Sequence, residues 1–204
     1  MNPAVQVLDY QASWPAAFEV AASQLAQALG DAGGALHHIG STSVPGLAAK
    51  PIIDMLLEVP DLAALDRRSG ALVAQGWEAK GEFGLPGRRY FRKTDAQGQR
   101  THHLHAFEAG SAEARRHLAF RDYLIAHPDV RAAYGALKRT LAAAHPEDMA
   151  AYMDGQGSLH QGPRGPRAAL GLATIESAPW TCCSTPLSCW TSPAPRCVRR
   201  NASA

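Results

Sequence analysis

Cysteine is absent from the first 160 residues of this 204-residue chain. A domain formed by these residues has no disulfide bonds, so its stability must come from a buried hydrophobic core. The four cysteines, which all lie near the C-terminus, are Cys182, Cys183, Cys189 and Cys197. They lack the regular CxxC spacing of zinc sites, so the sequence does not favour a structural zinc ion there.

A strong charge and long apolar runs are also missing. The formal net charge of +2 is too small to indicate nucleic acid or an acidic membrane surface as a partner. No apolar run approaches the roughly 18 residues of a membrane-spanning helix, and none resembles a secretory leader. We therefore expect a cytoplasmic globular protein.

The order of predicted elements indicates an α+β domain over residues 1–160. Helical spacing of apolar residues predicts helices over 14–29 and 61–75. The predicted strands are 35–39, 51–59, 77–80, 88–94 and 101–108, of which the last two form a hairpin. From Ser111 to about Asp154 the pattern is helical, with breaks before Pro128 and Pro146, which predicts a C-terminal helical cap.

The stretch from His37 to Val59, HHIGSTSVPGLAAKPIIDMLLEV, has the strongest functional signal. A loop of glycine and hydroxyl residues precedes an apolar strand that carries a single carboxylate, Asp54. Glycine lets a backbone approach a phosphate closely, and hydroxyl groups donate to phosphate oxygens. A carboxylate in a buried strand needs a compensating charge nearby. These features predict a nucleotide or metal site.

The segment HIGSTSVPGLAAKPIID resembles the signature of the GrpB family, which is assigned by resemblance to the nucleotidyltransferase superfamily. Other matching residues follow in the expected order: Asp9-Tyr10 with Trp14, Arg89-Tyr90-Phe91, His103-Leu104-His105, Phe120 to Leu124, and Tyr134 with Lys138. The resemblance covers roughly the first 160 residues. It implies a nucleotidyltransferase-like mixed β-sheet flanked by helices.

The resemblance also implies that the loop holds the phosphates of a ligand and that Asp54 holds a divalent metal ion, Mg²⁺ or Mn²⁺. The residues expected to bind phosphate are Gly40, Ser41, Thr42 and Ser43. A tight turn with a helix cap uses the same residue types, and this alternative stays open.

Basic residues would complete such a site. The resemblance implies that Lys50 and Arg89 neutralise charge during catalysis. It also suggests that Arg121 and Lys138 face the site, although an ion pair on a helix surface explains these two nearly as well.

Asp54 lacks the second carboxylate of a standard nucleotidyltransferase. The positions two residues away on its strand are Ile52 and Leu56, which cannot bind metal. Glu58 shares the same strand face but lies about 13 Å further along, too far to share an ion. The two-metal mechanism therefore lacks a ligand.

His103 and His105 offer a substitute, because they alternate on one face of a predicted strand. With Asp54 they would form a 2-His-1-carboxylate site, better suited to Mn²⁺, Fe²⁺ or Zn²⁺ than to Mg²⁺. We rank contact with phosphate or with Asp54 first, metal binding second and packing third.

From about Gln161 the composition changes to Pro, Ser, Thr, Arg and Cys without helical or strand periodicity. We expect residues 161–204 to be a disordered tail, and a shifted reading frame is our hypothesis for its origin.

The sequence thus predicts a nucleotidyltransferase-like protein that binds a nucleotide or another phosphorylated small molecule. Metal-dependent nucleotidyl transfer is the reaction to be tested. The alternative is a non-catalytic phosphate-ligand sensor or partner-binding domain that has lost the second metal carboxylate. No nucleic-acid partner is indicated.

Overall fold

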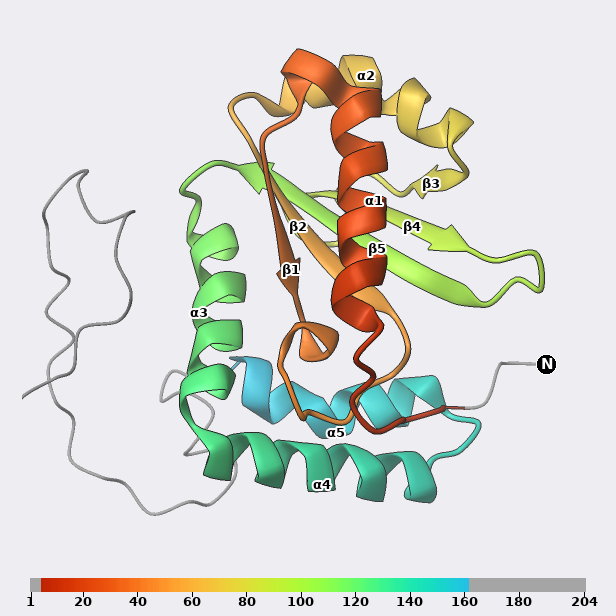
Figure 1. Cartoon of the computed structure of the whole chain (residues 1–204), viewed down its shortest axis with the longest axis vertical. Coiled ribbons are helices and arrows are strands. Elements are labelled where there is room, and N and C mark those ends of the chain that lie inside the picture. The colour runs from red at the N-terminus through yellow and green to blue at the C-terminus, as the bar shows by residue number, and fades with distance from the viewer. Residues whose placement is uncertain (1–4, 162–204) are drawn as a thin grey trace, which may run out of the picture. The chain divides into compact units, whose positions relative to one another are not determined.

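The computed structural model describes residues 5–161, which form a five-stranded mixed sheet flanked by helices (Figure 1). The strand order is β1-β2-β5-β4-β3. The elements in chain order are α1 (Trp14–Leu29), η1 (Gly30–Ala32), β1 (Ala35–Ile39), η2 (Ser41–Ser43), β2 (Ile53–Val59), α2 (Leu62–Ala74), β3 (Trp77–Ala79), β4 (Arg89–Thr94), β5 (Arg100–Glu108), α3 (Ala112–Ala126), α4 (Pro128–Ala144) and α5 (Met149–Gln161).

Strands β2 and β5 are parallel, whereas every other neighbouring pair in this sheet is antiparallel. The register places Asp54 of β2 beside His103 of β5 on one side and beside Ile39 of β1 on the other. The end of β1, the start of β2 and the start of β5 therefore meet at one end of the sheet. Helices α4 and α5 lie beyond this end (Figure 1).

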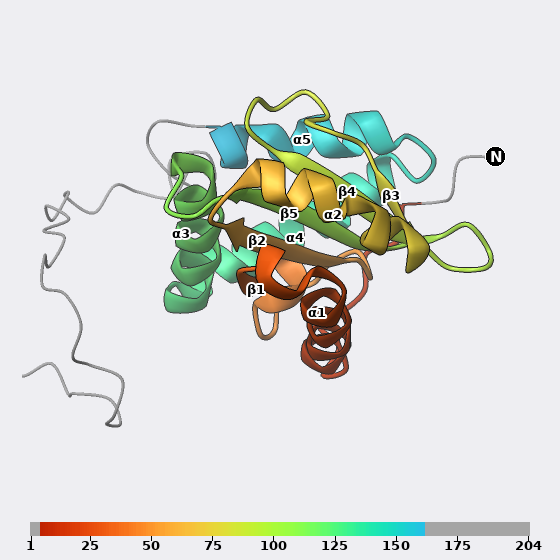
Figure 2. The same cartoon turned by 90° about the horizontal axis from the view of Figure 1, so that it is seen from above.

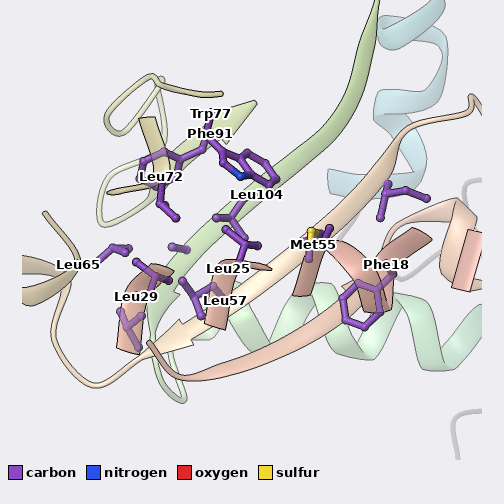
Figure 3. Close-up of a cluster of buried hydrophobic side chains, with 14 of the residues drawn as sticks. Phe18, Leu25, Leu29, Met55, Leu57, Leu65, Leu72, Trp77, Phe91 and Leu104 are labelled. Carbon is purple, nitrogen blue, oxygen red and sulfur yellow. The ribbon is translucent and has the colours of Figure 1, made fainter. Parts of the chain in front are cut away.

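Helices α1 and α2 pack against one face of the sheet, which we call the core face. Figure 2 shows α1 alongside the strands. Met55 and Leu57 point to this face from β2, and Leu104 points to it from β5 (Figure 3). Leu25 and Leu29 of α1 pack against them and are fully buried. Burial of each such leucine side chain contributes about 2 kcal/mol to stability. This core explains why α1 carries its apolar residues at helical spacing.

The opposite side is the site face, to which Asp54 points because side chains alternate along a strand. Helix α3 covers part of it, where Ala114 and Leu118 pack with Leu56 and Phe107. The remaining part of the site face is formed by β5 and β4. Helices α4 and α5 lie beyond the end of the sheet where β2 begins (Figure 1).

Local sequence signals account for several helix ends. Helix α2 begins after Asp61, whose carboxylate accepts hydrogen bonds from the backbone N–H groups of Ala63 (2.8 Å) and Ala64 (3.1 Å). Helix α4 begins at Pro128, where the missing N–H group costs no hydrogen bond.

The predicted α+β fold is confirmed, and every predicted helix and strand is present. Strand β2 begins at Ile53 rather than residue 51, and α5 extends to Gln161 rather than ending near Asp154. The predicted disordered tail lies outside the described residues. Within residues 5–161 no helix is long and apolar enough to cross a membrane.

Candidate functional site

Gly40 brings the loop after β1 directly against Asp54. Its backbone has φ +70°, and a Cβ atom at this position would lie 2.6 Å from Oδ2 of Asp54. Position 40 therefore requires glycine for two reasons: the backbone is left-handed, and a side chain would clash with Asp54. The single turn of η2 that follows carries the three hydroxyl residues of the motif.

Two of these hydroxyl groups shape the loop. Thr42 Oγ1 donates to the backbone oxygen of Ile52 (3.2 Å) and lies 3.0 Å from Nε2 of His38. Because this hydroxyl proton goes to a carbonyl, His38 must donate its Nε2–H to Thr42. Burial lowers the pKa of His38 to about 4, so the ring is neutral at pH 7. Ser43 Oγ donates to the backbone oxygen of Gly40 (2.6 Å).

These bonds agree with the tight-turn alternative for Thr42 and Ser43, whose side chains are occupied within the loop. Ser41 differs, because its side chain faces Tyr134 on α4 and acts to lower the pKa of that tyrosine, which burial raises. Ser41 is therefore the loop hydroxyl that reaches toward the helices at the sheet end.

Asp54 is an ionised carboxylate on the site face, with its side chain 30% exposed. Its Oδ1 lies 3.1 Å from Nδ1 of His103. Burial would raise the pKa of Asp54, but the hydrogen bond from His103, with a smaller contribution from the positive charge of Lys50, brings it below its usual value. The partner that this partly buried carboxylate has in the fold is therefore His103.

His103 and His105 each keep one ring nitrogen without a hydrogen-bond partner among the described residues, Nε2 of His103 and Nδ1 of His105. Burial lowers the pKa of His105 to about 3, so this ring is neutral. Tyr90 of β4 lies opposite His105 and contacts both rings on the site face, with its ring centroid 5.6 Å from that of His103 and 5.2 Å from that of His105.

The predicted metal ligands Asp54, His103 and His105 are not gathered into one site. Across residues 5–161 no group of three or more His, Cys, Asp or Glu side chains is arranged to hold a metal ion. Glu58 is also engaged elsewhere, since its carboxylate contacts Nε2 of His37 (3.0 Å) and the N–H group of Gly110 (3.0 Å). Mg²⁺ commonly binds one or two carboxylates together with ligand phosphates. Asp54 fits an ion held in that way.

Lys138 of α4 is the most unusual group of the site. Its side chain is 2% exposed, and its ammonium group has no hydrogen-bond partner in the described part of the chain. The Nζ atom lies 4.5 Å from the centroid of the Tyr134 ring. Burial lowers the pKa of Lys138 to about 7, although the negative charge of Asp54 acts to raise it. An ammonium group buried without an acceptor is costly unless an anion completes its surroundings.

Lys50 and Tyr134 lie near Lys138, and both contact residues of α5. Lys50 Nζ lies 3.5 Å from Sδ of Met149 and 5.3 Å from the centroid of the Tyr152 ring. Burial lowers its pKa, and Asp54 opposes that shift. The Tyr134 hydroxyl donates to Oε1 of Gln156 (3.1 Å). We call the set of Ser41, Lys50, Asp54 and Lys138 the Asp54 site.

Arg89 does not join this site. It is the register partner of Ala106 and points to the core face, where its guanidinium group binds both carboxylate oxygens of Asp66 (2.7 and 2.8 Å). The expectation that Arg89 shares a site with Asp54 needs this correction, because odd-numbered β4 side chains alternate away from the site face. Arg121 donates to the backbone oxygen of His38 (3.1 Å) and holds the end of β1.

The chain is similar in sequence to proteins of one known family. Residues 4–161 match the GrpB family, described as GrpB protein. The UPF0157 protein YqkA of Bacillus subtilis (strain 168) is 44% identical over 152 residues, which are 74% of this chain but only 44% of YqkA. The match thus spans less than half of the length of that relative.

Among solved structures, the conserved protein GrpB from Enterococcus faecalis is 42% identical with a TM-score of 0.74, over 81% of this chain and 98% of that one. The poly(U) polymerase Cid1 is a much weaker likeness, 12% identical with a TM-score of 0.48, over 75% of this chain and 50% of that one.

Proposed function

Because this chain belongs to the GrpB family and gathers a carboxylate, a loop hydroxyl and two lysines at one end of its sheet, we propose that the Asp54 site binds the phosphate groups of a nucleotide or another phosphorylated small molecule. The observation that carries this proposal is the buried ammonium group of Lys138 without a hydrogen-bond partner among the described residues. A phosphate would supply the missing acceptors and the compensating charge.

Nucleotidyl transfer is the reaction that we propose for this site. Asp54 would hold Mg²⁺ or Mn²⁺ together with the ligand phosphates, and the ion would neutralise their charge. Lys50 and Lys138 would add positive charge around the same phosphates. His103 would orient the Asp54 carboxylate through its 3.1 Å hydrogen bond.

A non-catalytic phosphate-ligand sensor is the second candidate. It is favoured by His103, which faces Asp54 at a register position where a further carboxylate would strengthen metal binding. Dependence on metal separates the two candidates, because a sensor that relies on Lys50 and Lys138 binds phosphate without a divalent ion.

A thermal-shift screen of nucleoside triphosphates, with and without Mn²⁺ or Mg²⁺, tests both candidates. A ligand that binds only the folded state raises the melting temperature. The screen compares wild type with Asp54→Asn and Lys138→Met. A metal-dependent shift that Asp54→Asn abolishes supports the transferase, and a metal-independent shift that only Lys138→Met abolishes supports the sensor.

Asp66→Asn is the matched control, because Asp66 is a carboxylate bound to Arg89 on the core face. It should leave every ligand-induced shift unchanged. A wild-type protein that melts cooperatively and shifts with no phosphorylated ligand would contradict phosphate binding at this site.

A further inference from the structure

Phe83 has a backbone conformation that is unfavourable for a phenylalanine. Its φ is +45°, and it is the only residue other than glycine with a positive φ among the residues that the structure describes. Phe83 is also 61% exposed, so burial of its side chain offsets little of the cost of this conformation. Positive φ at a bulky residue is a genuine outlier, and such conformations gather at functional sites.

The loop between β3 and β4 holds Phe83 in place. Oε1 of Glu82 accepts a hydrogen bond from the N–H group of Gly87 (2.7 Å), which closes the loop. Arg88 donates to the backbone oxygen of Phe83 (2.7 Å), and Leu85 packs on the apolar cluster of the site face. The exposed ring therefore stands on an ordered loop.

One face of the Phe83 ring is covered by Tyr90. The two rings are stacked, with centroids 5.2 Å apart and an angle of 21° between their planes. Tyr90 itself is 7% exposed, so its position is fixed by the sheet. Phe83 remains 61% exposed although Tyr90 stacks on it, so most of its surface is open to solvent, and a second planar group could stack on it from the side opposite Tyr90.

The stacked pair lies beside the Asp54 site. Tyr90 contacts the rings of His103 and His105, and His103 is hydrogen-bonded to Asp54. With strands about 4.8 Å apart, Tyr90 on β4 is two strands from Asp54 on β2. Phe83 adds the 5.2 Å stacking distance to Tyr90. An extended nucleotide with its phosphates at Asp54 would have to span this separation to bring its base to Phe83.

We propose that the free face of Phe83 stacks on the nucleobase of a nucleotide whose phosphates occupy the Asp54 site. This inference rests on the proposed function and adds a binding position for the nucleobase, which the phosphate site does not provide. Stacking on an aromatic side chain tolerates different bases, because every base has a planar face. Arg88, 5.1 Å from the centroid of the Tyr90 ring, is a positioning residue for the pair.

Calorimetric titration with a nucleoside triphosphate and with inorganic triphosphate tests the proposal in wild type, Phe83→Gly and Phe83→Tyr. Phe83→Gly removes the ring and introduces the residue that best tolerates positive φ. We expect it to weaken nucleoside triphosphate binding about tenfold and to leave inorganic triphosphate binding unchanged. Phe83→Tyr should bind both ligands as wild type does.

Val20→Ala is the control for loss of an exposed apolar side chain, since Val20 of α1 is 59% exposed and lies away from the site face. Unchanged nucleoside triphosphate affinity in Phe83→Gly would overturn the stacking role alone. An equal loss for both ligands would also overturn it, because the loop would then act on the phosphates. Wild type that binds neither ligand would overturn the proposed function together with this inference.

Discussion

Gly40 and Asp54 fit together so closely that a Cβ atom at position 40 would lie 2.6 Å from Oδ2 and 2.9 Å from Cβ of the aspartate. These two residues are 14 positions apart in the sequence, on the loop after β1 and on β2. Their contact fixes the loop against the carboxylate, so the position of Ser41 relative to Asp54 depends on a residue without a side chain.

Gly40→Ala should therefore destabilise the protein by about 2–4 kcal/mol, since it adds both a strained φ and a clash inside the site. Urea denaturation measures this change. Gly46→Ala is the matched control, because Gly46 has φ +79° but open space around its Cβ position. It should cost only about 1–2 kcal/mol. Equal losses in the two variants would contradict a close contact at Gly40.

Lys138→Met should make the protein more stable while removing phosphate binding. Methionine fills a similar volume and does not bury an ammonium group without an acceptor. We expect a gain of about 1–3 kcal/mol near pH 7, below the upper bound of about 5 kcal/mol that the shifted pKa of Lys138 implies. Urea denaturation gives the stability, and the thermal-shift screen gives the binding. A destabilised variant would mean that the ammonium group has a favourable partner.

The stability of the wild type should rise with pH above about 7 through Lys138. Its pKa is about 7 in the folded protein and near 10.5 in the unfolded chain, so the unfolded chain binds more protons between these values. Stability therefore increases across this window, and the increase should be absent from Lys138→Met. Denaturation of both proteins at several pH values from 6 to 10 measures the difference, and parallel curves would contradict a depressed pKa.

Phosphate affinity should change with pH in the opposite direction. Binding needs the charged form of Lys138, so affinity should fall above about pH 7, by at most about tenfold per pH unit. Lys138→Arg should flatten this dependence if the larger side chain is accommodated, because arginine stays charged throughout. Titration with inorganic triphosphate from pH 6 to 9 measures the effect. A flat wild-type profile would exclude a titrating lysine from the binding step.

Arg89→Ala should leave ligand binding unchanged, whereas Lys50→Ala should weaken it. Arg89 binds Asp66 on the core face, and loss of a partly exposed ion pair costs at most about 1 kcal/mol. Lys50 lies within electrostatic reach of Asp54. The thermal-shift screen with both variants separates the two faces, and a ligand-induced shift lost in Arg89→Ala would contradict this assignment.

The sequence by itself determined the order of helices and strands and the loop that begins at Gly40. These features depend on local periodicity and on residue types such as glycine and proline, which act over a few neighbouring positions. Asp54 was singled out for the same reason, since one carboxylate interrupts an apolar strand. The family resemblance supplied Lys138 as a suggestion. Alternation along the strand placed His103 and His105 on one face, and contact with phosphate or with Asp54 was the first-ranked role for them.

Only the tertiary structure decided which of these residues meet. Alternation along β4 puts Arg89 and Tyr90 on opposite faces of the sheet. The pairing of β4 with β5 in the fold decides that Tyr90 is the one that shares a face with Asp54. Burial of Lys138 depends on helices that are distant in the sequence. The left-handed conformation of Phe83 likewise belongs to the closed loop between β3 and β4, in which Glu82 accepts a hydrogen bond from the N–H group of Gly87. Sequence patterns indicate which side chains tend to be buried, but not which charges and rings the fold brings together.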